Sequence, residues 1–230
     1  MALTLPDAEH KAAVVEAMFD RIAPRYDLMN RLLTFRLDQR WRRLAARLLR
    51  LGPGDLVVDL GCGTGDMCEI ARAAGARVVG LDFAARMLDG ARARGAADAL
   101  LRADASRLPL RDGCASVVTS AFTLRNFASI PAVLAEAARV LRPGGRLALL
   151  EVDEPRHRLL RWGHTLYFRH AVPLVGALLV DRAAYAYLPE STAYLPAEAA
   201  LLGLLSEAGF RAPSKRRLAA GAAQLLLAER

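Results

Sequence analysis

Apolar and polar residues repeat with two different periods along this chain, and the change of period divides it into regions. In residues 9–50 the apolar residues recur at helical spacing, as they do between Val14 and Ile22. We expect Pro24 to end this first helix, because the residue before a proline disfavours the helical conformation. Further helical spacing follows, and the segment from Trp41 to Leu49 predicts a third amphipathic helix that stops at Gly52.

From Asp55 onwards, short apolar runs alternate with helical patterns. The runs predict strands at residues 56–60, 77–82, 99–103, 116–121 and 146–151, with helices at 66–74, 84–94 and 131–141. This alternation is typical of a parallel sheet with helices on both faces. A last helix at 197–208 and a hairpin of 210–217 and 222–228 complete the sheet. The predicted fold is α/β: a Rossmann-like, seven-stranded, mostly parallel sheet with an antiparallel C-terminal strand, an N-terminal helical cover and a helical insertion after the fifth strand.

Residues 155–190 interrupt this pattern and are rich in large apolar side chains. Their longest apolar run, Ala171–Val180, contains Pro173 and Gly176 and is too short to cross a bilayer. We expect a helical cap, whose apolar surface either packs on the core or forms a substrate wall or a lip facing a membrane. The length of 230 residues suits a single domain, 1–230, made of N-terminal helices (1–50), a cofactor-binding core (55–151), the cap (155–190) and a C-terminal helix and hairpin (197–230).

The stretch Val57–Asp66 carries the strongest chemical signal. A buried-strand pattern turns within it into glycines at every second position, Gly61, Gly63 and Gly65, and then into a helix. Such a turn presents backbone N–H groups and a partial positive charge to a ligand. The spacing is one residue tighter than the Gly-x-Gly-x-x-Gly pattern of dinucleotide sites. Asp59, at the end of the strand, would repel a pyrophosphate but suits a cationic amine or sulfonium.

Two more acids follow the next two strands. Asp82 ends the second strand, where a carboxylate can accept both hydroxyls of a ribose, and Asp104 follows the third. The carboxyl ends of parallel strands meet at one edge of the sheet, which is where ligands bind. A ligand with a ribose, an amino-acid head and a positive sulfur is S-adenosyl-L-methionine, which we predict as the cofactor. The N-terminal helices are expected to cover the mouth of its site.

Charge and composition restrict the other classes of partner. The net charge is +8 and the pI is near 10.1, but the arginines are scattered and the lysines are Lys11 and Lys215 alone. We therefore expect no nucleic-acid partner and only a weak attraction to anionic lipid. Cys62, Cys68 and Cys114 lack the spacing of a metal site and the histidines are dispersed, so no metal is expected. The N-terminus lacks the pattern of a secretory signal, which favours a cytoplasmic location.

Four further segments form a recognisable set: Phe19–Asn30, Leu124–Phe127, Arg142–Leu147 and Tyr185–Ser191. The first two resemble the N-terminal and central signatures of the ubiquinone/menaquinone biosynthesis C-methyltransferases, a family of class I S-adenosylmethionine-dependent methyltransferases. The third is shared with class I methyltransferases in general, and the fourth is similar to a late motif of the family. The resemblance covers roughly residues 17–228 in one register.

The resemblance also implies site residues, with cofactor contacts at Thr64, Asp82 and the pair Asp104-Ala105, and Tyr26 closing over the methionine end. Ala121 stands where the family has a serine, Thr123 where it usually has glycine, and Asp153 where it often has serine. The full predicted set of cofactor-binding residues is Tyr26, Asp59, Gly61, Gly63, Thr64, Gly65, Asp82, Phe83, Met87, Asp104, Ala105, Ser120 and Ala121.

The expected reaction is transfer of the sulfonium methyl to a ring carbon of a phenol or hydroquinone, with demethylmenaquinol or a related prenylated quinol as acceptor. The predicted catalytic residues are Arg125, Asn126 and Glu190. Arg125 would stabilise a phenolate and Asn126 would orient it. Because arginine stays protonated, the proton would pass to water or to a carboxylate such as Glu190 or Asp153. A structural salt bridge is the alternative role for Arg125.

Other functions stay open at this point. The departures from the family pattern favour, as an alternative, C- or O-methylation of another small aromatic or secondary metabolite, with His164 or His170 as base. A nucleic-acid methyltransferase would need an Asn/Asp-Pro-Pro-Tyr turn after the fourth strand, and the sequence has none. The expected partner is a small aromatic substrate; a homodimer and a peripheral contact with the inner face of the membrane are further hypotheses.

Overall fold

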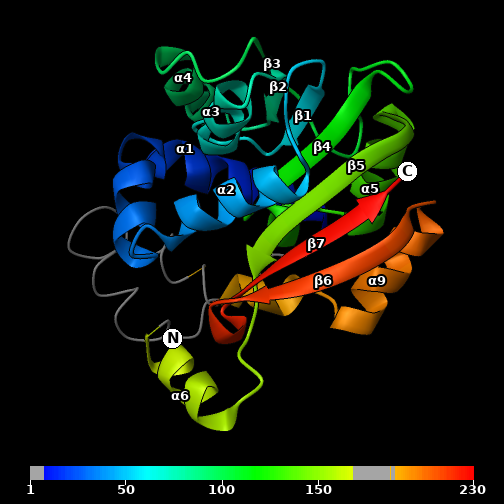
Figure 1. Ribbon diagram of the computed structural model, residues 1–230. Helices are drawn as coiled ribbons and strands as arrows, with labels where there is room; N and C mark the ends of the chain where they lie inside the picture. The colour runs from blue at the N-terminus through cyan, green and yellow to red at the C-terminus, as the bar shows by residue number, and fades with distance from the viewer. Residues whose placement is uncertain (1–7, 168–186, 188–189) are drawn as a thin grey trace.

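The computed structural model describes residues 8–167, 187 and 190–230. Within these residues seven strands form one sheet in the order β3-β2-β1-β4-β5-β7-β6 (Figure 1). Neighbours from β3 to β5 pair in parallel, whereas β7 runs antiparallel to both β5 and β6. The predicted α/β fold class is confirmed. The strands are β1 (Leu56–Leu60), β2 (Arg77–Asp82), β3 (Ala99–Arg102), β4 (Ala115–Ala121), β5 (Leu141–Val152), β6 (Arg211–Leu218) and β7 (Ala223–Glu229).

The order of the strands reverses at β1. The strands β2 and β3 follow on one side of it, and β4 and β5 lie on the other. Val57, Val58 and Leu60 of β1 are fully buried, as is expected of a central parallel strand covered on both faces. Ligands bind beyond the carboxyl ends of the strands at such a reversal. The fold therefore places the glycine loop, which follows β1, at the ligand-binding edge.

Helices cover both faces of the sheet. On one face, Leu134, Leu201 and Leu205 contribute fully buried side chains from α5 and α9. On the other face, Ala71 and Ala91 contribute small side chains from α3 and α4, so these helices lie close to the strands. The helices and the short turn after β4 are α2 (Leu37–Leu48), α3 (Asp66–Ala73), α4 (Ala85–Ala93), η1 (Leu124–Asn126), α5 (Ile130–Val140) and α9 (Glu198–Glu207).

The first helix, α1 (Ala8–Leu33), continues through Pro24, so the prediction that Pro24 ends it is wrong. Pro24 is exposed, whereas Ile22 and Met29 on either side of it are buried in a cluster with residues of α4. This packing outweighs the cost of an interior proline, which is about 3 kcal/mol. The chain turns instead at Phe35 and Arg36, whose backbones take the left-handed conformation.

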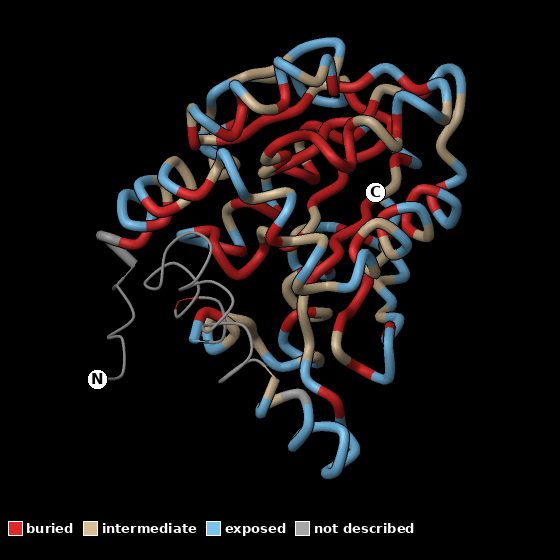
Figure 2. Tube along the Cα trace, turned by 90° about the vertical axis from the view of Figure 1, so that its left-hand side faces the viewer, coloured by how far each residue is buried: buried red, intermediate tan, exposed pale blue. Residues whose placement is uncertain are grey.

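The described part of the predicted cap consists of residues 155–167, which include α6 (Arg158–Leu166), together with Tyr187 and Glu190; the short turn η3 (Thr192–Tyr194) follows the cap. The apolar run Ala171–Val180 lies outside the described residues. Buried residues follow the strands and the inner sides of the helices around them, whereas α6 is exposed along most of its length (Figure 2). None of the helices in the described ranges is long and apolar enough to cross a membrane.

Candidate active site

The loop between β1 and α3 leaves its backbone open to a ligand. Gly61 and Gly63 both have positive φ, at 63° and 56°, which glycine adopts without steric cost. A Cβ on Gly61 would overlap Cγ2 of Thr123, so this position has no room for a side chain. A Cβ on Gly63 would meet no atom within 4 Å. The backbone at Gly63 is therefore accessible from the pocket side.

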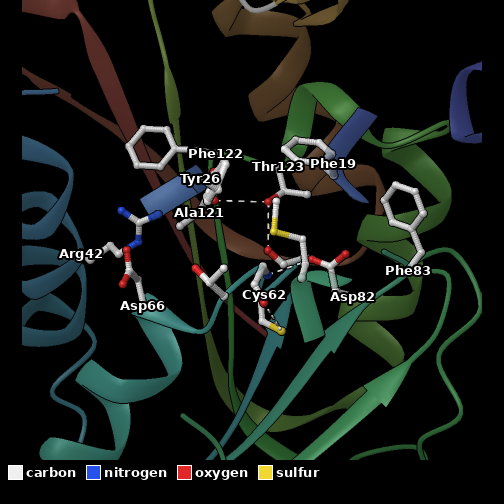
Figure 3. Close-up of a pocket in the computed structure, with 14 residues that line it drawn as sticks. Phe19, Tyr26, Arg42, Cys62, Asp66, Asp82, Phe83, Ala121, Phe122 and Thr123 are labelled. Carbon is white, nitrogen blue, oxygen red and sulfur yellow. Dashed lines mark hydrogen bonds between the residues drawn. The ribbon is translucent and has the colours of Figure 1, made fainter. Parts of the chain in front are cut away.

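A pocket opens over this loop at the carboxyl ends of β1, β2 and β4 (Figure 3). Tyr26 reaches it from α1 and packs edge-on against Phe19, with ring centroids 6.0 Å apart. Burial raises the pKa of the Tyr26 hydroxyl to about 12, so the phenol is neutral. The N-terminal helices cover the pocket in this way. Eight residues of the predicted cofactor set line it: Tyr26, Gly61, Gly63, Thr64, Asp82, Phe83, Met87 and Ala121.

Asp82, at the end of β2, is the predicted ribose ligand. Its Oδ2 accepts a hydrogen bond of 2.8 Å from the backbone N–H of Gly63, and its Oδ1 accepts one of 2.9 Å from Ala84. Burial raises the pKa of this carboxyl to about 6, against the opposing effect of the backbone donors. The carboxylate is thus held between the glycine loop and the start of α4, facing the pocket in one orientation.

Five residues of the predicted set lie outside the lining: Asp59, Gly65, Asp104, Ala105 and Ser120. Asp59 is buried beneath the loop and accepts a hydrogen bond of 2.7 Å from the Thr119 hydroxyl. Burial raises the pKa of its carboxyl to about 6. Asp104 is exposed and accepts from the Ser106 N–H, whereas the buried Ser120 donates to a carbonyl of β1. Asp59 therefore lies beneath the pocket without lining it.

The lining also includes residues that were absent from the predicted set. Arg42, on α2, is buried; its Nη1 donates to Asp38 at 2.8 Å, and its guanidinium carbon lies 5.0 Å from the centre of the Phe122 ring. The signal in the sequence was the pair Asp38 and Arg42 four residues apart, a spacing usual for surface ion pairs on helices. The additional lining residues are Phe19, Arg42, Cys62, Asp66, Phe122 and Thr123.

A charged network ties the N-terminal helices to the loop. Asp66, at the start of α3, accepts a hydrogen bond of 2.8 Å from Arg94, which also pairs with Asp27 of α1 at 2.9 Å. Asp27 in turn accepts a hydrogen bond of 2.5 Å from the Thr64 hydroxyl. Burial opposes ionisation of Asp66, but the nearby Arg42 and Arg94 outweigh it and lower the pKa of its carboxyl. The cover and the loop are thus fixed to each other.

The central signature residues Arg125 and Asn126 lie in η1 and line neither this pocket nor the cavity described next. The buried guanidinium of Arg125 pairs with Glu151, and its Nε donates to the Ser191 hydroxyl at 3.1 Å. Asn126 accepts a long hydrogen bond of 3.4 Å from the Tyr187 hydroxyl, and its Nδ2 has no acceptor among the described residues. In this conformation Arg125 joins η1 to the end of β5.

Glu190, the third predicted catalytic residue, lies in the lining of a separate cavity of about 470 Å³ at the carboxyl end of β5. Asp153 lines it too and pairs with the buried Lys215 at 2.8 Å. Gln224 also lines it, with an Oε1 atom that has no partner in the described part of the chain. The three predicted catalytic residues are therefore not gathered in one pocket, and their roles stay predictions.

The chain is similar to known methyltransferases along most of its length. The sequence pattern of the ubiE/COQ5 methyltransferase family matches residues 7–229. A demethylmenaquinone methyltransferase of Thermus thermophilus is 46% identical over 200 residues, covering 84% of this chain and 91% of that protein. The ubiquinone/menaquinone biosynthesis C-methyltransferase UbiE of Syntrophotalea carbinolica is 42% identical over 211 residues and 89% of each chain. A crystal structure of a SAM-dependent methyltransferase from Aquifex aeolicus shares the fold, with a TM-score of 0.60 and 17% identity over 84% of this chain and 92% of that one.

Proposed function

The chain belongs to the ubiE/COQ5 methyltransferase family, and we propose that it methylates a ring carbon of demethylmenaquinol with S-adenosyl-L-methionine as donor. It is an S-adenosylmethionine-dependent methyltransferase, and the names of its relatives in Thermus thermophilus and Syntrophotalea carbinolica support a quinone precursor as acceptor. The observation that carries the proposal is the pocket in which the glycine loop, Asp82 and Tyr26 meet. The family match extends over nearly the whole chain around it.

The residues of the pocket fit this donor. Asp82 offers a fixed carboxylate for two ribose hydroxyls, and the backbone at Gly63 is open beside it. Phe83 and Met87 follow β2 and supply apolar contacts for an adenine ring. Asp59 lies just beneath the loop, and a buried carboxylate attracts a positive sulfur more strongly than one in water. When bound, the donor supplies a methyl group activated by its sulfonium sulfur.

The chain's contribution to methyl transfer is mainly positioning. Direct displacement needs no protein nucleophile, and alignment of two reactants alone can supply about 7–11 kcal/mol of the barrier. Tyr26 and Phe19 close the pocket from α1, which excludes water from the methyl group. Thr123, which follows β4, packs against Gly61 and donates a hydrogen bond to its carbonyl. This contact fixes the side of the pocket that faces β5.

The cavity at the carboxyl end of β5 is the proposed approach of the acceptor. It lies one strand beyond β4, whose end lines the donor pocket. Arg125 and Asn126 follow β4 and would act on the acceptor hydroxyl, Arg125 through its charge and Asn126 through its amide Nδ2, which has no acceptor among the described residues. Of the carboxylates in the cavity, Asp153 is paired with Lys215, whereas Glu190 is exposed to solvent. Glu190 is therefore the better placed to receive the proton of the phenol.

A prenylated acceptor resides in a membrane, and one corner of the protein is suited to contact it. Leu159 and Trp162 of α6 are 69% and 67% exposed, and Phe35 of the α1–α2 turn is 75% exposed. Tyr167 joins the two segments, since its ring lies 6.1 Å from that of Phe35 and its hydroxyl donates to the carbonyl of Leu33. Apolar side chains interleaved with arginines, as on α6, are typical of helices that lie in the interface of an anionic membrane.

Co-sedimentation with lipid vesicles tests this contact. The wild type is expected to bind vesicles containing an anionic lipid and to bind neutral vesicles less. The double variant Leu159→Ser/Trp162→Ser should lose most of this binding, whereas Leu48→Ser, at the far end of α2 from Phe35, should not. Equal binding by all three proteins would exclude α6 as the contact.

Product analysis tests the reaction itself. Purified enzyme is incubated with methyl-labelled donor and either demethylmenaquinol or a prenylated benzoquinol precursor, and the product is identified by mass spectrometry. We expect one added methyl on a ring carbon of demethylmenaquinol. If S-adenosylhomocysteine binds but neither quinol is methylated, the acceptor is another small aromatic compound. If S-adenosylhomocysteine does not bind, the proposed function is wrong.

A further inference from the structure

Arg42 carries a buried hydrogen-bond donor that no group in the described part of the chain satisfies. Its side chain is 5% exposed, and Nη1 donates to Asp38, which is itself fully buried. The guanidinium carbon lies over the Phe122 ring, 5.0 Å from its centre. The Nε atom has no acceptor among the described residues. Buried donors are normally paired, and one without a partner at a ligand pocket points to an acceptor on the ligand.

The position of Arg42 in the pocket indicates which part of a ligand it meets. Figure 3 shows Arg42 beside Asp66, on the side of the pocket opposite Asp82 and Phe83. Asp82 suits the ribose, so an elongated donor would place its amino-acid end near Arg42. The charged residues of the lining are Arg42, Asp66 and Asp82, and the positive charge among them belongs to Arg42.

We propose that Nε of Arg42 binds the carboxylate of the methionine half of the donor. A hydrogen bond between a guanidinium and a carboxylate is charge-assisted and among the stronger ones in proteins. The other arginines around the pocket are already committed, since Arg94 and Arg31 both pair with Asp66. Asp38 and Phe122 hold the guanidinium on two sides, and Arg42 lines the pocket between them. The N-terminal cover thereby contributes to recognition of the donor as well as to its enclosure.

The proposal rests on the proposed function, in which S-adenosylmethionine is the donor. Two ligands that differ only in the carboxylate test the role of Arg42 separately from the identity of the donor. Decarboxylated S-adenosylmethionine keeps the adenosine, the sulfonium and the amine but lacks the carboxylate. Calorimetry in the absence of acceptor measures the affinity of each protein for both ligands. The wild type should bind the decarboxylated ligand about 10–100-fold more weakly than the donor itself, the range expected for loss of one charge-assisted hydrogen bond.

Two substitutions then assign this difference to Arg42. In Arg42→Met the two ligands should bind within about threefold of each other, because the group that reads the carboxylate is gone. Arg43→Met, an exposed neighbour on α2 outside the pocket, should keep the full discrimination. Arg42→Lys keeps the charge beside Asp38 and serves where the methionine variant does not fold; it should lose most of the discrimination because it lacks Nε.

Comparing the affinities of the two ligands for the same protein distinguishes carboxylate recognition from a purely structural role of Arg42. A variant that merely loosens the N-terminal cover weakens the binding of both ligands equally and preserves the ratio of their affinities. If Arg42→Met or Arg42→Lys still prefers the carboxylated donor by the wild-type factor, the proposal is overturned. If the wild type binds neither ligand, the proposed function fails before Arg42 is at issue.

Discussion

The buried ion pair between Arg125 and Glu151 allows a structural role of Arg125 to be separated from a catalytic one. The two side chains are 6% and 0% exposed. Glu151 also accepts hydrogen bonds from the backbone N–H groups of Arg125 and Val152, at 3.1 and 2.8 Å. Arg125→Met would leave a carboxylate inside the protein with only these two donors. The pair therefore stabilises the junction of η1 and β5 as long as both partners are present.

The expected cost follows from the burial. Removing one partner of a buried pair typically costs about 3–5 kcal/mol, because the remaining charge is left uncompensated. This is a large share of a total stability of about 5–15 kcal/mol. For a chain of this size it corresponds to a fall in Tm of roughly 6–20 °C. Arg92→Met, which breaks an exposed pair with Asp89, should cost less than about 1 kcal/mol and is the matched control.

The double variant Arg125→Met/Glu151→Gln should recover most of the lost stability. The Gln side chain has no charge to compensate, and its carbonyl oxygen can still accept from Val152. A coupling energy of about 2 kcal/mol or more is therefore expected from the double-mutant cycle. Urea unfolding measures the free energy of unfolding of each variant. An unchanged m-value shows that a shift of the midpoint reports a change of stability alone.

Turnover of the same variants, measured where each remains folded, decides the catalytic role. If Arg125 stabilises a developing phenolate, the double variant regains stability but stays about 10²–10³-fold slower, the usual loss for one electrostatic donor. Wild-type turnover in the double variant would remove Arg125 from the mechanism. A single Arg125→Met variant within about 1 kcal/mol of the wild type would refute the reasoning from burial.

Two further predictions concern the floor of the pocket. The pKa of Asp59 rises from its ordinary 3.8 to about 6 on folding, so the folded state binds the proton more tightly and its stability falls as the pH rises from about 4 to 6. The free energy of unfolding of Asp59→Asn should therefore exceed that of the wild type by about 3 kcal/mol at pH near 7.5 and equal it below pH about 4. Urea unfolding midpoints measure this difference, and a difference that does not depend on pH would contradict the prediction. Gly61→Ala should destabilise by about 1–3 kcal/mol because its Cβ meets Thr123, and Thr123→Gly should restore part of this loss in thermal unfolding; no restoration would show that the positive φ alone is responsible.

The sheet could be predicted because each strand is short, apolar and bounded by turn residues. The predicted bounds of β1 and β2 agree with the structure, and those of the other parallel strands differ at their ends. β5 begins earlier, at Leu141, because Leu141 pairs with Ala115 and the following glycines bond to Arg230. The prediction that the first helix ends at Pro24 is wrong for a different reason. A local rule for proline says nothing about the tertiary packing of Ile22 and Met29.

The acids at the strand ends show where sequence patterns stop being informative about a site. Asp59, Asp82 and Asp104 were assigned by one argument, yet Asp82 lines the pocket, Asp59 lies beneath the loop and Asp104 is exposed. Successive side chains of a strand point to opposite faces, so a shift of one residue at the strand end turns a side chain away from the ligand, and a residue beyond the strand is no longer directed by it. Asp82 is the last residue of β2, Asp59 the second to last of β1, and Asp104 lies beyond β3.

The other half of the pocket could not be read from any local pattern. Asp38 and Arg42 lie four residues apart on a helix, which is the usual sign of a solvent-exposed pair. Both are buried here because Trp41 packs against Phe122 and so brings α2 against the end of β4. The burial turns an ordinary ion pair into a fixed guanidinium whose Nε has no acceptor in the described part of the chain. In the proposed binding mode the sheet edge contacts the nucleoside, whereas the amino-acid end is read by Arg42, whose place depends on how the N-terminal helices dock on the sheet.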